Sequence, residues 1–466
     1  MTEPRTNLSA AADELLVSLD RDTSTPLHRQ LEAAIRDAIR TGRMRQGSAL
    51  PSSRSLAGDL GISRGVVVEA YQQLTAEGYI VGKSGGYTQV AATQAPSPPP
   101  RPAIQDRPTI DLLYGRPDVS QFPRAAWLRS VRRVLTEAPH ERLIYLEGRG
   151  APELRGALAD YLNRVRGTWA TPENIVVCSG FAQGWALTTQ VLAATGARRL
   201  AVEDPSFDDV RPVAAGAGLD ILGIPVTESG IDVAALEATD ADAVLVTPAH
   251  QLTGAVLSPR KRTALLDWAR RRGAVVIEDD YDAEYRYDQA PVGALQGLAP
   301  DHVVYAGSAS KTLAPGLRLG WLIVPNRLVD DIAAAKLDQD RGSPVIDQLA
   351  FADFIARGEF NRHLRRMRPI YHRRRDALLT ALAERLPDLR PAGVSAGLHL
   401  IAWLPPHLDE SAIVDAAARR GLGINGLAPH RIAESRHGGL LFGYAKSSER
   451  ATADGIDLLA EVIEEL

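Results

Sequence analysis

The chain has 466 residues, of which 45% are hydrophobic and 24% charged, and its 53 basic and 57 acidic side chains give a formal net charge of −4. These values exclude a wholly disordered or collagen-like chain, and taken as a whole they favour a cytoplasmic enzyme over a nucleic-acid binder. Because Cys178 is the single cysteine, the sequence excludes an intrachain disulfide and a Cys-rich zinc site, and we expect a reducing compartment and no metal. The N-terminus lacks the apolar run of a signal peptide, and no stretch of about 18 apolar residues indicates a membrane span, so no membrane partner is expected.

A proline-rich segment divides the chain into a small N-terminal part and a large C-terminal part. Residues 92–108 contain six prolines among 17 residues and show no apolar period. Such a segment is typical of a semi-extended linker, which would span roughly 50 Å at ~3.1 Å per residue, although an ordered surface loop is the alternative. We therefore predict one domain over residues 14–91 and a second over residues 109–466.

The N-terminal domain shows three helical patterns followed by a hairpin pattern. Apolar residues recur at helical spacing over 27–39, and a second short helix is expected over 53–60. Ser63 can cap a third helix, and two β-like runs at 79–81 and 88–90 flank a turn that contains glycines. Three helices followed by a hairpin predict a winged helix-turn-helix domain.

The order and spacing of these pieces resemble the DNA-binding domain of GntR-type regulators, on the segments LPSSRSLAGDLGISRG at 50–65 and AYQQLTAEGYI at 70–80. The resemblance implies that the third helix reads base edges in the major groove, where Arg64 can donate two hydrogen bonds to guanine. Residues 26–90 carry eight basic and five acidic side chains, a local balance of +3 that suits double-stranded operator DNA. A helix-turn-helix used only for protein contact is the alternative. The candidate DNA-binding residues are Ser52, Ser53 and Arg54 at a backbone phosphate, Ser63, Arg64 and Gly65 at the start of the recognition helix, and Lys83, Gly85 and Gly86 in the wing.

The C-terminal part alternates short apolar runs with amphipathic helices. The runs at 175–177, 199–202, 243–246, 274–277 and 303–305 have the length of buried strands. Strands that alternate with helices predict an α/β fold, with a mainly parallel sheet that helices cover on both faces.

The segment 307–320, which reads GSASKTLAPGLRLG, resembles the lysine segment of fold-type I aminotransferases that depend on pyridoxal phosphate. A lysine amine beside an aldehyde cofactor forms a Schiff base, and the resemblance implies that role for Lys311. It also implies that Ser308, Ser310 and Arg318 bind the cofactor, with Ser308 and the planar fork of Arg318 at its phosphate.

Three further segments agree with a pyridoxal phosphate site. Asp279 and Tyr281 follow a predicted strand, and the resemblance implies that Asp279 pairs with the pyridinium nitrogen while Tyr281 bonds the 3′ oxygen. A solvated charge cluster is the alternative for this stretch. Phe207 follows another strand and would stack on the ring, unless it is a plain core phenylalanine. A glycine turn that opens a helix would present N–H groups to the phosphate. The residues of this turn are Gly180, Phe181 and Ala182.

Four other candidates stand at positions that depart from the family pattern or lie outside these motifs. Tyr145 matches a tyrosine that reaches the phosphate from the partner subunit in aminotransferase dimers, with a core tyrosine as the alternative. His250 stands in TPAHQLTG, one residue shorter than the family pattern HQ-aromatic-PTG, so a role near the ring and a structural role both stay open. Aminotransferases carry a carboxylate-binding arginine on a late strand, whereas the stretch at 439–444 has none, and Arg431 or Arg436 would substitute for it.

A GntR-type domain joined to an aminotransferase-like body resembles the MocR/GabR-type bacterial regulators over nearly the whole chain. The resemblance implies a fold-type I body with a smaller C-terminal α+β lobe over about 370–466, and a homodimer that binds operator DNA. Its effector would be an amino compound or pyridoxal phosphate itself, sensed through the Lys311 Schiff base. Asp208 and Asp209 would disfavour an anionic ligand if they faced the site.

The alternative function is an active aminotransferase with an accessory DNA-binding domain. The residues expected to be catalytic, Lys311, Asp279 and Tyr281, are all present together with Arg318. The missing late-strand arginine argues against efficient turnover of amino acids, so we expect a regulator rather than a physiological enzyme. A structural DNA-binding protein whose body only dimerises is the third possibility.

Overall fold

The computed structural model describes residues 19–83, 87–91, 108–281, 284–287, 293–393, 396–433 and 437–466. The chain forms two compact units, Met1–Gln105 and Asp106–Leu466, each with its own hydrophobic core. No helix in the described part of the chain is long and apolar enough to cross a membrane.

The N-terminal unit is a winged helix-turn-helix, as predicted. Its helices are α2 (Leu27–Arg40), α3 (Ser53–Asp59) and α4 (Arg64–Ala76), and its strands are β1 (Ala49–Leu50), β2 (Ile80–Lys83) and β3 (Tyr87–Val90). The strands form an antiparallel sheet in the order β1-β3-β2. Gly61, at φ +60°, lets the chain turn between α3 and α4. The apolar faces of α2 and α4 meet in the core at Leu31, Ile35, Val67 and Leu74, all fully buried.

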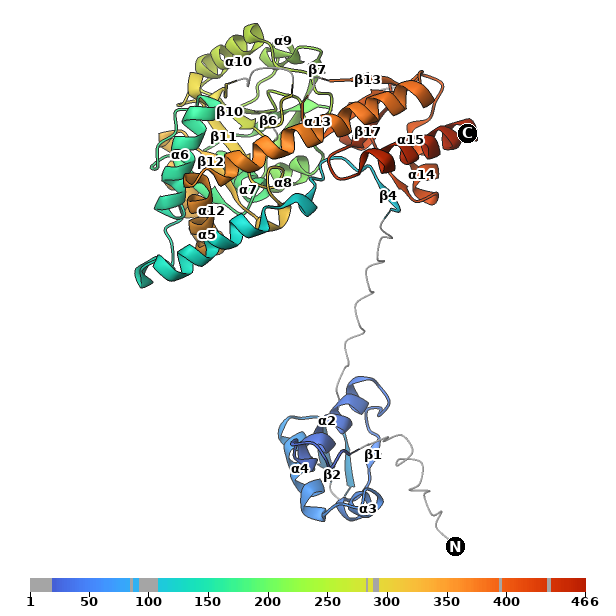
Figure 1. Cartoon of the computed structure of the whole chain (residues 1–466). Helices are drawn as coiled ribbons and strands as arrows, with labels where there is room; N and C mark the ends of the chain where they lie inside the picture. Colours follow the sequence, from blue (N-terminus) through green and yellow to red (C-terminus); the bar gives the residue numbers. More distant parts are fainter. Residues whose placement is uncertain are drawn as a thin grey trace. The chain divides into compact units, whose positions relative to one another are not determined.

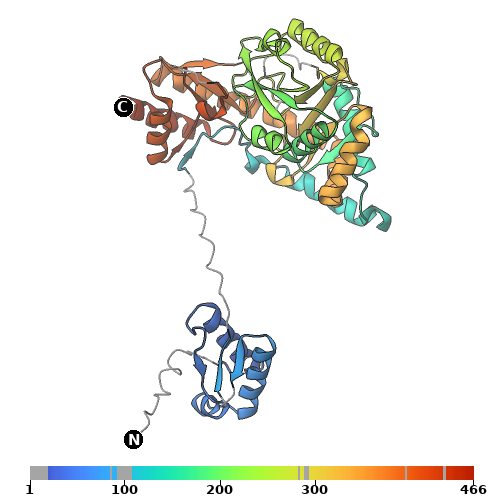
Figure 2. The same ribbon diagram turned by 180° about the vertical axis from the view of Figure 1, so that it is seen from behind.

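A sheet forms the centre of the C-terminal unit (Figures 1 and 2). It has eight strands, in the order β5-β12-β11-β10-β9-β6-β7-β8. Neighbouring strands are parallel, except that β12 runs antiparallel to both β5 and β11, and β8 runs antiparallel to β7. The predicted α/β class and mainly parallel sheet are confirmed, although the sequence patterns did not indicate β7, β8 and β12. The strands are β5 (Ile175–Cys178), β6 (Arg199–Asp204), β7 (Asp220–Thr227), β8 (Gly230–Ile231), β9 (Ala243–Val246), β10 (Val275–Asp279), β11 (Val303–Ser308) and β12 (Gly320–Ile323).

Helices cover both faces of this sheet. On one face, strand residues such as Val176 and Ile277 pack against α7, α8 and α11. On the other face, residues such as Val177 and Val276 pack against α6, α9, α10 and α12, with α5 packed against α12. Because both faces are buried, the strands are continuous apolar runs. The helices are α5 (Arg124–Glu137), α6 (Pro152–Arg166), α7 (Phe181–Ala194), α8 (Val210–Gly216), α9 (Val233–Glu237), α10 (Pro259–Arg272), α11 (Asn326–Asp340) and α12 (Val345–Ala356).

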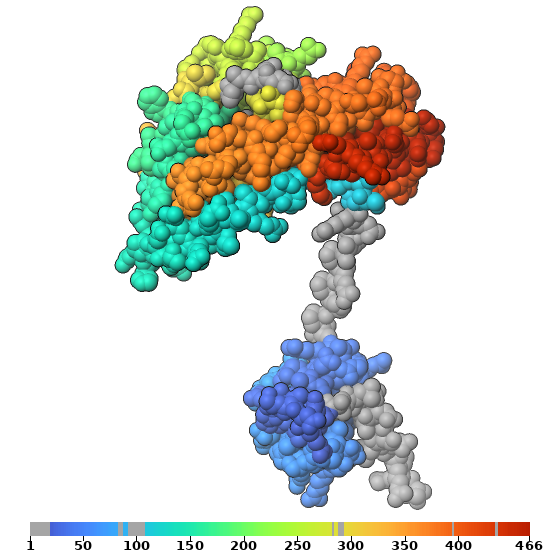
Figure 3. All heavy atoms as spheres, in the orientation of Figure 1, coloured from blue at the N-terminus to red at the C-terminus, as the bar shows by residue number. Residues whose placement is uncertain are grey.

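A smaller lobe completes the C-terminal unit. The long helix α13 runs along the face of the unit and packs against α15 in the lobe (Figure 3). Residue 370, from which the lobe was expected to begin, lies inside α13. The short strand β4 pairs in parallel with β15, so the beginning of the unit lies on this lobe. The elements are β4 (Ile110–Asp111), α13 (Glu359–Arg385), β13 (Arg390–Ala392), β14 (His399–Trp403), α14 (Glu410–Arg419), β15 (Leu422–Gly423), β16 (Asn425–Gly426), β17 (Gly439–Gly443) and α15 (Glu449–Glu464), with a sheet in the order β13-β14-β17-β16.

Candidate functional site

Lys311 lies in the loop that joins β11 to the antiparallel strand β12. The ladder between these strands closes the base of the loop, where Ser308 is paired with Gly320. The N–H of Ala309 also donates to the carbonyl oxygen of Leu319 over 2.9 Å. Because β12 turns back along β11, both ends of the lysine loop are held at one edge of the sheet.

Arg318, Gly180 and Gly320 form a tight cradle at the start of α7. Nη2 of Arg318 donates to the carbonyl oxygen of Ser179 over 2.6 Å. A Cβ on Gly180 would lie 2.9 Å from that nitrogen, and a Cβ on Gly320 would lie 2.7 Å from the Cα of Gly180. Gly180 also has φ +80°, a conformation that favours glycine. The two glycines therefore allow the guanidinium to lie directly against the beginning of the helix.

The first turn of α7 supplies backbone donors beside this guanidinium. Gly180 is the N-cap residue and has no side chain to accept from the first N–H groups of the helix, which begins at Phe181 and Ala182. A helix N-terminus carries partial positive charge, and with Arg318 next to it this place favours an anion such as a phosphate group. The structure thus brings together four of the predicted cofactor residues, namely Gly180, Phe181, Ala182 and Arg318.

The amine of Lys311 is half-buried and reaches a segment that the sequence patterns did not indicate. Its Nζ donates to the carbonyl oxygen of Gly115 over 2.6 Å. The segment before Gly115 is fixed to the C-terminal lobe by β4 and by the N–H of Gly443, which donates to Leu112 over 2.8 Å. The contact joins positions 196 residues apart, so no local pattern could have identified Gly115.

Asp279, Phe207 and His250 line one small pocket at the carboxyl ends of β6, β9 and β10. Asp279 is the last residue of β10 and is only 9% exposed. Phe207 is half-buried and also packs against the core formed with α7 and α8. An ionised carboxylate in such a place is stabilised by a positive partner, which makes Asp279 suited to a protonated ring nitrogen.

His250 is held on both sides of its ring. Its Nε2 lies 2.9 Å from the carbonyl oxygen of Pro205, and its Nδ1 accepts from the N–H of Thr253 over 3.0 Å. Nε2 therefore carries the hydrogen, and burial lowers the pKa of His250 to about 4. The neutral ring joins the loop after β9 to the loop after β6, so His250 has a structural role in addition to lining the pocket.

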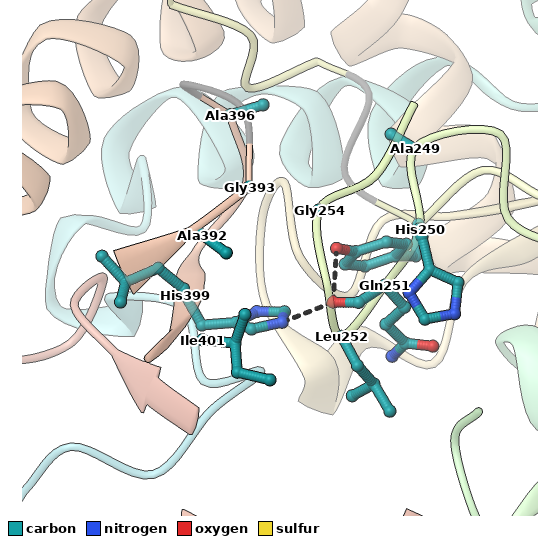
Figure 4. Close-up of a pocket in the computed structure, with 12 residues that line it drawn as sticks. Ala249, His250, Gln251, Leu252, Gly254, Ala392, Gly393, Ala396, His399 and Ile401 are labelled. Carbon is teal, nitrogen blue, oxygen red and sulfur yellow. Dashed lines mark hydrogen bonds between the residues drawn. The ribbon is translucent and has the colours of Figure 1, made fainter. Parts of the chain in front are cut away.

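Tyr281 and His399 converge on the carbonyl oxygen of Gln251; Figure 4 labels Gln251 and His399. The hydroxyl of Tyr281 donates to the carbonyl oxygen of Gln251 over 3.3 Å, and Nε2 of His399 lies 2.5 Å from the same oxygen. The Tyr281 and His399 rings lie 6.4 Å apart. His399 begins β14 in the C-terminal lobe, and no sequence motif marked it as a site residue.

Glu203 lies at the end of β6 and lines the pocket of Asp279. It makes the stability of the C-terminal unit depend on pH. Burial raises the pKa of Glu203 to about 8, although its Oε2 accepts from the N–H and hydroxyl of Thr247. In the unfolded chain this carboxyl group has its ordinary pKa of 4.5, so the folded chain keeps a proton that the unfolded chain releases. The free energy of unfolding should therefore fall as the pH rises from about 5 to about 8.

We expect the Glu203→Gln variant to lose less stability over this range than the wild type, by about 1.4 kcal/mol for each unit of pKa separation. All six tryptophans lie in the C-terminal unit, so urea unfolding followed by their fluorescence reports that unit alone. Glu278 and Glu284, whose pKa values burial raises to about 7, are present in both proteins and cancel in the comparison. Identical slopes against pH would contradict the expectation.

The remaining predicted cofactor residues have distinct surroundings. Ser308, at the end of β11, and Ser310, in the lysine loop, are both half-buried. Tyr145 is 89% exposed and follows the exposed Leu143 and Ile144, so it is not a core tyrosine. Within this single chain the structure does not bring Tyr145 into the cradle.

Of the two candidate carboxylate-binding arginines, Arg431 does not line the pockets of Asp279 and Tyr281. Arg431 lines a separate cleft with Trp403 and Arg390, and its Nη2 donates to the carbonyl oxygen of His437 over 2.8 Å. Arg436 lies outside the described residues. Among the residues that the structure describes, no group of three or more His, Cys, Asp or Glu side chains could hold a metal ion.

The N-terminal unit gathers its predicted DNA contacts at the beginnings of α3 and α4. Ser52 caps α3, its Oγ accepting from the N–H of Ser55 over 3.2 Å. Nε of Arg64 donates to Oγ of Ser53 over 3.3 Å, which joins the two helix starts. The exposed residues of this surface are Ser52, Arg54, Ser63, Arg64 and Gly65. Gly85 and Gly86 lie outside the described residues, and of Lys83 only the backbone, in β2, is described.

Two family models match the chain, one over each unit. Residues 27–90 match the bacterial regulatory proteins of the gntR family, and residues 108–424 match aminotransferase class I and II. The regulator YdeL of Bacillus subtilis, named as an HTH-type transcriptional regulator, is 33% identical over 87% of this chain and 90% of its own. PdxR of Corynebacterium glutamicum, a pyridoxine biosynthesis regulator by name, is 32% identical over 94% of this chain and 96% of its own. MocR of Rhizobium meliloti, named as a probable rhizopine catabolism regulator, is 30% identical over 95% of both chains.

Solved structures resemble the larger part of the chain. The α-aminoadipate aminotransferase LysN of Thermus thermophilus superposes with a TM-score of 0.70 at 24% identity, over 76% of this chain and 92% of its own. An archaeal alanine:glyoxylate aminotransferase gives the same TM-score at 26% identity, over 76% of this chain and 91% of its own. The fold-type I aminotransferase fold predicted for the body is thereby confirmed.

Proposed function

Because the chain belongs to the MocR-type family of GntR-like transcriptional regulators, we propose that its aminotransferase-like body binds pyridoxal phosphate and senses an amine through Lys311. The signal would change how the winged helix-turn-helix binds double-stranded operator DNA in the cytoplasm. The observation that carries the proposal is the arrangement of the β11–β12 loop, which holds Lys311 and at its other end places Arg318 on the start of α7.

The donor set fits pyridoxal phosphate. The cradle of Arg318 and the first N–H groups of α7 suit a phosphate, and Asp279 and Phe207 line a pocket suited to a protonated aromatic ring. The bound cofactor supplies an aldehyde that condenses with primary amines. Lys311 provides the amine of the chain itself, and the carbonyl of Gly115 orients it. An effector amine that replaces Lys311 would release this contact and so favour a different state of the body.

A homodimer would complete the site. Tyr145 and its neighbours Leu143 and Ile144 form an exposed apolar stretch, and α5 exposes Leu128 and Leu135. Exposed apolar side chains of this size gathered on two adjoining elements are typical of a protein interface. A second copy that covers them would place its Tyr145 at the phosphate of the first.

The test compares the wild type with Lys311→Ala. We expect the variant to lose both the visible absorbance band of lysine-bound cofactor and the response of DNA binding to amines, because Lys311 would make the bond that the amine displaces. DNA from upstream of the protein's own gene serves as the probe, and the affinity without effector should stay largely unchanged.

Arg64→Ala is the reciprocal control, since Arg64 lies in the other unit. We expect it to weaken DNA binding roughly tenfold to a hundredfold, as for the loss of a bidentate base contact, and to keep the absorbance band. An amine response that persists in Lys311→Ala would overturn the sensing role. Sustained amino transfer to 2-oxoglutarate by the wild type would instead favour an enzyme.

A further inference from the structure

A pocket beside Tyr281 contains no charged side chain among its described lining residues. It lies between the loop after β9 and the strands β13 and β14 of the C-terminal lobe (Figure 4). Its lining includes Gln251, Leu252, Tyr281, Ala392, His399 and Ile401, and it also includes His250. Both histidines are neutral, because burial lowers the pKa of each to about 4. The positive charge of Lys311 contributes to the low pKa of His399, which places the amine within electrostatic reach of the pocket.

His399, which lines this pocket, carries a buried hydrogen-bond acceptor. Its Nε2 lies 2.5 Å from the carbonyl oxygen of Gln251 and therefore carries the hydrogen. The other ring nitrogen, Nδ1, is a bare acceptor that is buried and has no hydrogen-bond partner among the residues that the structure describes, in a residue only 7% exposed. A buried acceptor that lacks a donor lowers stability, so a ligand that donates a hydrogen bond there would gain affinity.

Two carboxylates act on the aromatic ring that packs against His399. The ring of Tyr114 lies 5.4 Å from the rings of both His399 and His430, and burial, together with the carboxylates of Asp208 and Asp209, raises the pKa of Tyr114. Asp208 itself lies 3.1 Å from Nδ1 of His430.

Two arginines of the same region, Arg211 and Arg431, are engaged elsewhere. The guanidinium of Arg211 donates to the backbone carbonyls of Pro429 and Arg431. The side chain of Arg431 lines the cleft that contains Trp403. A ligand carboxylate in the pocket would thus give up its water for an uncharged lining with two carboxylates nearby.

We propose that the effector is a primary amine without a carboxylate, whose far end donates a hydrogen bond to Nδ1 of His399 in the uncharged pocket beside Tyr281. The inference rests on the proposed sensing role of Lys311 and adds the chemical class of the amine. A hydroxyl or a second amino group provides the required donor, and the nearby carboxylates tolerate either one.

The test uses matched amines on the full-length chain loaded with pyridoxal phosphate. 4-Amino-1-butanol and 4-aminobutanoate share the amine and the chain length and differ in the far group, and pairs one carbon shorter and longer cover other distances. Two readouts are followed, the displacement of the lysine-bound absorbance band and the affinity for DNA from upstream of the gene. We expect the alcohol to act at a concentration at least about tenfold lower than the acid in the pair that fits best.

Butylamine and His399→Phe test the hydrogen bond. The alcohol should act at a lower concentration than butylamine in the wild type, and this advantage should disappear in His399→Phe, which lacks the acceptor. Should that variant fail to fold, the comparison of alcohol, acid and butylamine on the wild type still tests whether the effector needs a hydrogen-bond donor and no carboxylate. Acids that act as well as the alcohols would overturn the inference alone, whereas the proposed function would fall with it if no amine changes the absorbance band or the DNA affinity.

Discussion

A methyl group on Gly320 is expected to lower the affinity for pyridoxal phosphate about 100-fold, because the cradle allows no side chain at this position. The new Cβ would lie 2.7 Å from Cα and 2.8 Å from the carbonyl carbon of Gly180. Backbone atoms on both sides must then separate, which moves the start of α7 away from Arg318. A phosphate would lose its alignment with the guanidinium of Arg318 and with the first N–H groups of α7. Each of these two sets of charge-assisted hydrogen bonds stabilises the bound phosphate by roughly 1.5–3 kcal/mol.

Gly316→Ala is the matched control for Gly320→Ala. Gly316 lies in the same loop, and a Cβ there would have no heavy atom within 4 Å. Titration of the cofactor-free chain with pyridoxal phosphate, followed by absorbance, should give wild-type affinity for Gly316→Ala. Equal affinities of the two variants would show that the cradle does not bind the phosphate.

We expect Gly443→Ala to destabilise the C-terminal unit by about 3 kcal/mol through overpacking. Its Cβ would lie 2.2 Å from the carbonyl oxygen of Leu113 and 3.0 Å from Cα of Tyr114. Gly443 ends β17, and its N–H donates to Leu112, so the incoming segment lies flat on this strand. A displaced segment would also move Gly115 away from the amine of Lys311, and the absorbance of the lysine-bound cofactor should change.

Gly216→Ala controls for the substitution itself. Gly216 ends α8 and a Cβ there meets no heavy atom within 4 Å, so the variant should be neutral or gain up to about 1 kcal/mol from helix propensity. Urea unfolding followed by tryptophan fluorescence measures both variants. A Gly443→Ala midpoint equal to that of Gly216→Ala would show that the segment can shift without cost.

Much of the fold could be predicted from the sequence because its signals are local. The strand runs at 243–246 and 303–305 are apolar throughout, since helices bury both of their faces. The strand β12 escaped prediction because Gly320–Ile323 begins on the last residue of the lysine motif and is too short to show a period. Its antiparallel course between β5 and β11 is a matter of pairing, which sequence periodicity does not encode.

The candidate site likewise has a part that the sequence predicts and a part that it does not. Lys311 and Arg318 share one short motif, so the sequence alone places both in one loop. Gly115 and His399 come from segments far away in the chain, and only the packing of the C-terminal lobe brings them to the site. The role expected for Tyr145 needs a partner subunit, and a single chain shows only that this side chain is exposed.

The antiparallel course of β12 also lowers the entropic cost of cofactor binding, because it orders the lysine loop beforehand. Residues 309–319 would need to give up much conformational freedom if the lysine loop closed only around a ligand. The ladder between Ser308 and Gly320 instead closes the loop when the sheet folds. Pyridoxal phosphate then meets a preorganised cradle and keeps more of its contact energy as affinity. Under the proposed function, a cofactor held in this way would stay with the folded chain, and the exchangeable amine would act as the signal.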